Sequence, residues 1–146
     1  MQKVNEVFKD AIGQDSVKKT LSVYIDAYKK TNRMPFLNFT TQKGGGKTFF
    51  ARKFREALKR TDGSTPPMLE VNGKTIKNAN SFFEQVYPVW VQNKAHLFID
   101  EGHNLPNELQ QIFLSVFNVD KNPIRTVDHD MIPYTFDFRE ISFCMA

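Results

Sequence analysis

Apolar side chains recur every three or four positions in several stretches of the chain. This spacing places them on one side of a helix and predicts helices over 14–32, 49–60, 81–90 and 105–118. In the second of these, Phe50, Phe54 and Leu58 form the apolar stripe. The basic residues of that helix are expected on its solvated side: Arg52, Lys53, Arg55, Lys59 and Arg60.

Short apolar runs between the helices predict strands over 36–40, 68–71, 95–99 and 141–146. Helices that alternate with buried strands indicate an α/β fold, in which a mostly parallel sheet is covered on both faces. A hairpin is expected within 122–138, with its turn near Asp128–Asp130. Ser81 and Glu84 have the spacing of a capping box and are expected to begin the third helix.

The stretch "TTQKGGGKTFF" (40–50) has most of the features of a phosphate-binding loop, G-x-x-x-x-G-K-[ST]. The chemistry needs backbone N–H groups around the phosphates, a lysine charge, and a hydroxyl for Mg²⁺. Gly46, Lys47 and Thr48 fit the motif, whereas Thr41 stands where the first glycine belongs. We interpret Thr41 as a tolerated variation; the alternative is a glycine-rich turn with an incidental lysine.

A pair of acids follows the expected strand at 95–99, in the stretch "HLFIDEGH". Asp100 is a candidate Mg²⁺ ligand, and Glu101 is a candidate to orient or deprotonate a water. Ligands of parallel sheets bind at the carboxyl ends of strands, where both this pair and the glycine-rich loop are expected. His103 either reads the nucleotide state or is an ordinary loop histidine. His96 and His129 are expected to be structural or solvent-facing.

The bulk composition is that of one globular domain of 146 residues, with 40% hydrophobic and 25% charged residues. The net charge of +4 is uneven, because residues 1–63 sum to +8 and residues 64–146 to −4. Such asymmetry fits a polyanionic ligand or merely solvated helix faces. Cys144 is the single cysteine, no apolar run approaches the length of a membrane span, and a cytoplasmic protein is expected.

Several of these segments together resemble AAA+ P-loop ATPases, and among them the RuvB family of Holliday-junction branch-migration motors. The stretch "FKDAIGQDSVKKTLSVYIDAYKK" is similar to the N-terminal box of that family, and "TQKGGGKT" to its Walker A loop. The stretch "LFIDEGHNLPNELQQIFLSVF" is similar to its Walker B strand and following helix. The segment "DFREISFCMA" is similar to the strand that leads to sensor 1.

The resemblance implies a three-layer AAA+ core over 1–146 that binds ATP and Mg²⁺, without the last strand, the arginine finger or the helical lid. It also implies a homo-oligomer of the hexameric type, DNA as a partner, a RuvA-like protein partner, and an insertion at 122–138 that contacts partner protein or DNA. The implied nucleotide-binding residues are Ile12, Gly13, Gly44, Gly45, Gly46, Lys47, Thr48 and Phe49, with Thr48 and Asp100 on the metal and Lys47 and Glu101 in catalysis.

Two other functions stay open at this point. One is an AAA+ ATPase of the helicase-loader or clamp-loader type. The other is a truncated nucleotide-binding module without efficient turnover, since a lid and a neighbour's arginine normally complete such sites.

Overall fold

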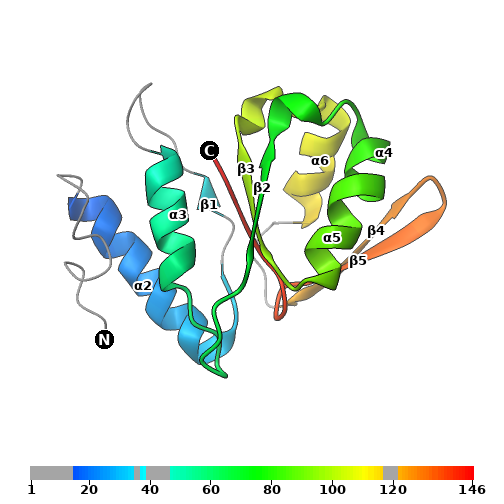
Figure 1. Ribbon diagram of the computed structural model, residues 1–146. Coiled ribbons are helices and arrows are strands. Elements are labelled where there is room, and N and C mark those ends of the chain that lie inside the picture. The colour runs from blue at the N-terminus through cyan, green and yellow to red at the C-terminus, as the bar shows by residue number, and fades with distance from the viewer. Residues whose placement is uncertain (1–14, 35–36, 39–46, 117–121) are drawn as a thin grey trace.

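A four-stranded parallel sheet forms the centre of the molecule in the computed structural model, which describes residues 15–34, 37–38, 47–116 and 122–146. Its strands stand in the order β1 (Leu37–Asn38), β6 (Ser142–Met145), β3 (His96–Asp100) and β2 (Met68–Asn72) (Figure 1). The last strand of the chain therefore lies between two strands that precede it, and the α/β class with a parallel sheet is confirmed.

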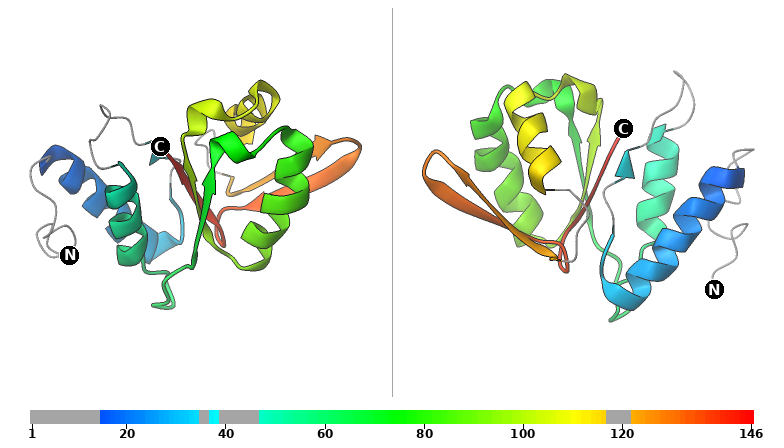
Figure 2. Two further views of the ribbon diagram at one scale, coloured as in Figure 1. Left: turned by 45° about the horizontal axis from the view of Figure 1, so that its top comes forward. Right: turned by 180° about the vertical axis from the view of Figure 1, so that it is seen from behind.

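Helices cover both faces of this sheet (Figures 1 and 2). On one face lie α2 (Asp15–Thr31) and α3 (Lys47–Ala57), and on the other α4 (Ala79–Ser81), α5 (Tyr87–Gln92) and α6 (Asn107–Val116). The apolar stripe of α3 packs against the buried residues of α2, as its spacing predicts; this cluster contains Leu21, Ile25, Tyr28, Phe50, Phe54 and Leu58. No helix among the described residues is both long and apolar enough to cross a membrane.

Side chains of β3 alternate between two different environments because successive residues of a strand point to opposite faces. Leu97 and Ile99 belong to the large apolar cluster under α5 and α6. Phe98 faces the other way and packs with Ala51 of α3. The ring of His96, on the same face as Phe98, meets Phe54 of α3 edge-on at 6.1 Å between centroids. By this alternation, Asp100 belongs to the face that α3 covers.

The helical segment between β2 and β3 differs from the prediction. It begins earlier, because the Asn78 side chain, and not Ser81, accepts the N-terminal hydrogen bond, from the Ser81 N–H at 2.8 Å. Its middle, Phe82–Val86, is a π-helix that leads into α5. Pro88 in α5 has no N–H to donate to the preceding turn, and a locally widened helix accommodates such a residue. The expected capping box at Ser81 and Glu84 is therefore wrong.

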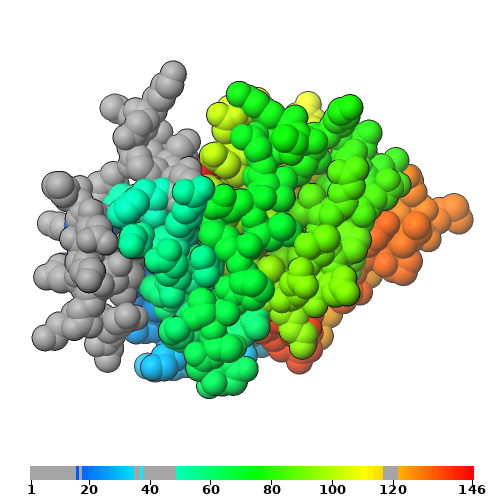
Figure 3. All heavy atoms as spheres, in the orientation of Figure 1, coloured from blue at the N-terminus to red at the C-terminus, as the bar shows by residue number. Residues whose placement is uncertain are grey.

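Strands β4 (Ile124–His129) and β5 (Ile132–Asp137) form an antiparallel hairpin, where the sequence pattern predicts one. Its turn lies at Asp130 and Met131, both with positive φ, as a two-residue hairpin turn requires. The hairpin lies against the π-helix and α5, because Tyr134 stacks on Phe83 at 4.2 Å and the Tyr87 hydroxyl donates to the Thr135 carbonyl at 2.7 Å. Figure 3 shows its tip protruding from the molecule.

Candidate functional site

The carboxyl ends of the parallel strands meet at one edge of the sheet, and this edge carries the acidic pair. Asn38 of β1 lies beside Met145 of β6, and Met145 lies beside Ile99 of β3. Asp100 is the next residue of β3. Neighbouring strands are about 4.8 Å apart, so the ends of β1 and β3 are separated by about 10 Å, the width of one intervening strand.

The N-terminus of α3 lies at this same edge. Helix α3 begins at Lys47, one turn before Ala51, which packs on Phe98. Asp100 is two residues beyond Phe98 on the same face of β3, and Figure 1 shows the start of α3 at the level of this strand end. The structure thus brings the start of α3 and the Asp100 position to one face and one edge. The N–H groups at a helix start can bind an anion, and a neighbouring carboxylate can bind its counter-cation.

Glu101 leaves the strand in an unusual backbone conformation. Its φ of 54° and ψ of 48° lie in the left-handed region, which costs a non-glycine residue energy. The conformation is held from several sides: the Glu101 N–H donates to Asp100 Oδ1 at 2.9 Å, and the Asn104 N–H donates to the Glu101 carbonyl at 3.0 Å. The next N–H, that of Gly102, donates to the Ala146 carbonyl at 2.8 Å.

The Glu101 side chain meets polar groups from two neighbouring segments. Its Oε2 lies 3.0 Å from Lys74 Nζ and accepts a hydrogen bond from Asn104 Nδ2 at 3.3 Å. Lys74 belongs to the short 3₁₀ turn η1 (Gly73–Thr75), and Asn72 at the end of β2 caps that turn by accepting from the Lys74 N–H at 2.9 Å. The Glu101 carboxylate thus lies between its own turn and the turn after the neighbouring strand, in a pair that is exposed to solvent.

Gly73 permits a close approach of this turn to the acidic pair. A Cβ at Gly73 would lie 2.4 Å from the backbone oxygen of Glu101 and 3.5 Å from that of Asp100. Real Cβ atoms do not approach a carbonyl oxygen so closely, so only glycine allows the two turns to meet here. Asn72, Gly73, Lys74 and Asn104 were not among the residues expected in the site. The first three had a signal in the sequence, since "NGK" follows a predicted strand of the same parallel sheet.

Other residues expected in the site have different placements. Ile12, Gly13, Gly44, Gly45 and Gly46 lie outside the described residues. Lys47 and Thr48 are placed as the first two residues of α3. Phe49 follows them and is 39% exposed, with its ring edge-on to Phe50 at 6.0 Å.

The acidic end of β3 offers few metal ligands of its own. Within the described segments, no group of three or more histidine, cysteine or carboxylate side chains is placed to hold a metal ion. Mg²⁺ is commonly held by only one or two protein oxygens together with substrate phosphates. A single carboxylate such as Asp100, at the end of the strand that the start of α3 adjoins, fits that mode of binding.

The three histidines have separate surroundings. His96 is fully buried, its Nδ1 paired with Ser142 Oγ at 2.7 Å and its Nε2 with Cys144 Sγ at 3.1 Å, so it is structural as expected. His129 is the last residue of β4, and its ring stacks on Phe83 and is hydrogen-bonded to Asn80, so it is not solvent-facing. His103 is exposed in the turn after Glu101.

The basic side predicted for the helix over 49–60 is exposed at Arg52 and Lys59, as expected, and the prediction is wrong at the residues that are only half-exposed. Arg52 forms a two-point pair with Glu70, at 2.7 and 3.2 Å, and this hydrogen bonding lowers the pKa of the Glu70 carboxyl. Lys59 donates to Thr65 Oγ1 at 2.6 Å. Arg55 and Arg60 are half-buried. The charge of this face is therefore partly neutralised before any external partner is considered.

Replacing Glu101 with glycine is expected to raise the free energy of unfolding by about 0.5–1 kcal/mol. Glycine adopts the left-handed conformation without the cost of about 1–2 kcal/mol that other residues bear, and its greater freedom in the unfolded chain offsets part of the gain. The exposed pair with Lys74 contributes little. Urea unfolding measures the change, and Glu101→Gln, which keeps the strain, is the control. A glycine variant less stable than the glutamine variant would contradict the assignment of strain.

The sequence is similar to part of a curated protein. Over 115 residues it is 32% identical to the Holliday junction branch migration complex subunit RuvB of Phytoplasma mali (strain AT), an alignment that covers 75% of this chain. The chain spans about a third of the length of that relative, 31%. No protein-family model matches the chain.

Proposed function

We propose that this chain is an ATP-binding AAA+ core of the RuvB-like branch-migration type, with Mg·ATP bound between the start of α3 and the end of β3. The observation that carries the proposal is the placement of Asp100 on the same face and the same edge of the sheet as the N-terminus of α3. The partial similarity to RuvB supports the family, and the motif residues at Gly44–Thr48 support the ligand.

Each part of this site has a role in the proposed chemistry. The N–H groups at the start of α3 and the positive end of its dipole would bind phosphate oxygens. The Lys47 ammonium would lie by the β- and γ-phosphates. Thr48 and Asp100 would hold Mg²⁺, which when bound neutralises charge on the transferred phosphoryl group. Glu101 would orient a water and accept its proton.

ATP binding without efficient turnover is the second candidate function, and the contacts of Glu101 favour it. The Glu101 carboxylate has one oxygen, Oε2, engaged by both Lys74 Nζ and Asn104 Nδ2. A carboxylate engaged in this way is less available to a water. In this arrangement the protein would bind Mg·ATP and hydrolyse it slowly. DNA binding, oligomerisation, a protein partner and a helicase-loader or clamp-loader role belong to the proposal for the whole protein.

Binding of a fluorescent ATP analogue, with and without Mg²⁺, tests the proposal directly. Wild type is expected to bind the analogue more tightly with Mg²⁺ than without it. In Asp100→Asn the ratio of these two affinities is expected to fall about tenfold, because removing a charged ligand from a metal costs about 1–2 kcal/mol. Glu101→Gln is expected to bind like wild type but to lose whatever turnover wild type has.

The matched control is Glu84→Gln, an exposed acid in the π-helix between α4 and α5. It removes the same charge and is expected to leave the affinity and its Mg²⁺ dependence unchanged. Absence of Mg²⁺-dependent nucleotide binding by wild type would refute the proposed function. Measurable turnover by wild type that disappears in Glu101→Gln would favour the ATPase over the binding module.

A further inference from the structure

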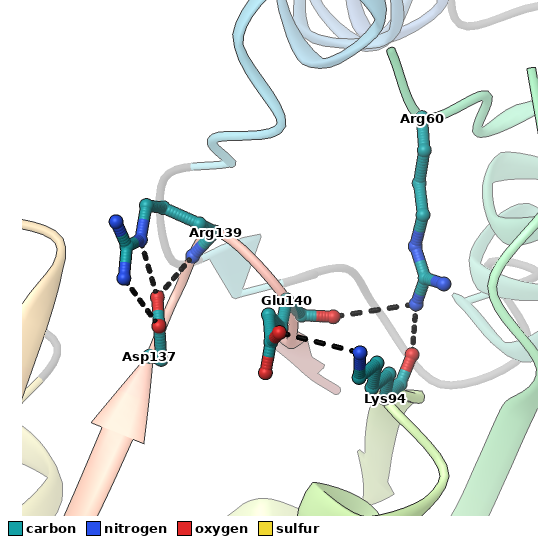
Figure 4. A network of polar contacts seen from close by, with 5 residues as sticks. All are labelled: Arg60, Lys94, Asp137, Arg139 and Glu140. Carbon is teal, nitrogen blue, oxygen red and sulfur yellow. Dashed lines mark hydrogen bonds and ion pairs between the residues drawn. The ribbon is translucent and has the colours of Figure 1, made fainter. Parts of the chain in front are cut away.

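Arg60 follows α3 and joins it to two turns that are distant in the sequence (Figure 4). Its Nη2 donates to the backbone carbonyl of Lys94 and, at 3.3 Å, to that of Glu140. The first turn leads directly into β3 and the second into β6. These are the two central strands of the sheet, so Arg60 attaches the C-terminal end of α3 to their starting points.

The two turns are also joined to each other without Arg60. Lys94 Nζ and Glu140 Oε1 lie 3.3 Å apart, and the buried Trp90 Nε1 lies 2.9 Å from the Ala95 carbonyl and 3.2 Å from that of Ser142. The sheet therefore keeps its own connections when Arg60 is removed. What Arg60 adds is the connection of this pair of turns to α3.

This connection bears on the position of α3 along its own axis. The contacts of α3 with the sheet include apolar packing of Ala51 on Phe98 and the edge contact of Phe54 with His96. Such contacts are not directional and allow small sliding movements. Hydrogen bonds to carbonyls weaken steeply when distance or angle changes, so the two bonds of Arg60 resist such a slide. The 11 residues of α3 form a rigid helix about 16 Å long. Arg60 follows its C-terminal end, and its N-terminal end lies at the edge of the sheet that carries Asp100.

The bonds of Arg60 to the two turns come from its Nη2 atom. Its Nε is buried and has no hydrogen-bond partner in the described part of the chain. The two Nη2 bonds are therefore the contacts that a substitution of the guanidinium would remove.

We propose that Arg60 is a positioning residue for the nucleotide site: it holds α3 in register with β3 and so sets the separation between the helix N-terminus and Asp100. The proposal rests on the proposed function, since it assigns Arg60 to the same site. Phosphate binding requires the loop and the helix start alone. The proposed ligands of Mg²⁺ come from both α3 and β3. The contribution of Mg²⁺ to nucleotide binding therefore depends on the position of α3 along β3.

The test is the ratio of nucleotide affinities with and without Mg²⁺ in Arg60→Gln, measured with the fluorescent ATP analogue. The affinity without Mg²⁺ is expected to stay near that of wild type. The gain from Mg²⁺ is expected to fall by about tenfold, because displacements of about 1 Å are enough to disrupt a positioned site. A general loss of stability would lower both affinities together and leave the ratio unchanged.

The matched control is Arg139→Gln, which removes a guanidinium from the same edge of the molecule. Arg139 pairs with Asp137 at 2.7 Å within its own turn (Figure 4). The variant Arg139→Gln is therefore expected to leave the ratio at the wild-type value. If Arg60→Gln does not fold, Arg60→Met replaces it, because methionine keeps an unbranched stem and has no N–H to donate to the two carbonyls.

A wild-type ratio in the folded Arg60 variant, or an equal loss in Arg139→Gln, would overturn the positioning role. If wild type shows no Mg²⁺-dependent binding at all, both the proposed function and this inference are wrong. The two failures are thus distinguishable, because the first leaves wild-type binding intact and the second does not.

Discussion

Replacing Gly73 with alanine is expected to lower the free energy of unfolding by about 2–3 kcal/mol, the upper range for forced overpacking. The added Cβ would lie 2.4 Å from the Glu101 carbonyl oxygen. The oxygen belongs to the backbone, and the backbone fixes the position of a Cβ, so neither atom can move away by a change of rotamer. The η1 turn and the turn after β3 must separate, and this displaces Asp100 and Glu101 together.

The same substitution is expected to reduce the Mg²⁺-dependent part of nucleotide binding by at least about tenfold, since a small displacement disrupts a positioned site. Urea unfolding and the fluorescent nucleotide measure the two effects separately. Gly102→Ala is the matched control: its added Cβ would meet the Met145 side chain, with Sδ at 2.0 Å. Methionine is flexible and can adopt another rotamer. An equal loss in both variants would show that the backbone contact at Gly73 has no special role.

The stability of the protein is expected to fall as the pH is lowered from about 6.5, because of His96. Burial lowers the pKa of this imidazole to about 3, so the folded protein keeps it neutral. In the unfolded chain the same side chain takes up a proton near pH 6.5. Below that pH the unfolded state binds more protons, and stability is lost as the pH falls toward the folded-state pKa.

The expected loss is about 1.4 kcal/mol per pH unit once the unfolded histidine is protonated, or about 2 kcal/mol between pH 6.5 and pH 5. Comparing wild type with His96→Gln isolates this contribution, because glutamine does not titrate and the other acids and bases remain. The difference in unfolding free energy between the two proteins should shrink by that amount as the pH falls. A His96 variant with the pH dependence of wild type would contradict the assignment.

Physical regularities of single segments made much of the fold predictable. A parallel strand buried on both faces must be apolar throughout, so "HLFI" before Asp100 identified β3. The 3.6-residue period identified α3, and Phe50, Phe54 and Leu58 are buried as predicted. The hairpin expected within 122–138 forms there. Each of these signals depends only on residues that are close together in the sequence, so the sequence alone is enough to detect them.

The helix between β2 and β3 shows where local reasoning failed. Ser81 and Glu84 have a capping spacing, yet Asn78 accepts the capping hydrogen bond and the helix starts before Ser81. Asparagine and serine are both good caps, so the local sequence allowed either start. The burial of Phe82 and Phe83 against the hairpin and α6 favours the earlier start. A tertiary contact thus decided between two locally acceptable boundaries.

By itself, the sequence determined the class of fold, the order of its elements and the place of the acidic pair at a strand end. Only the tertiary structure decided which residues surround that pair. Lys74 contacts Glu101 and Gly73 touches its carbonyl because β2 is the neighbour of β3, and Arg60 reaches Lys94 and Glu140 because β6 inserts beside β3. Strand order depends on the free energy with which buried faces from the whole chain pack together. A local period or motif contains no information about that packing.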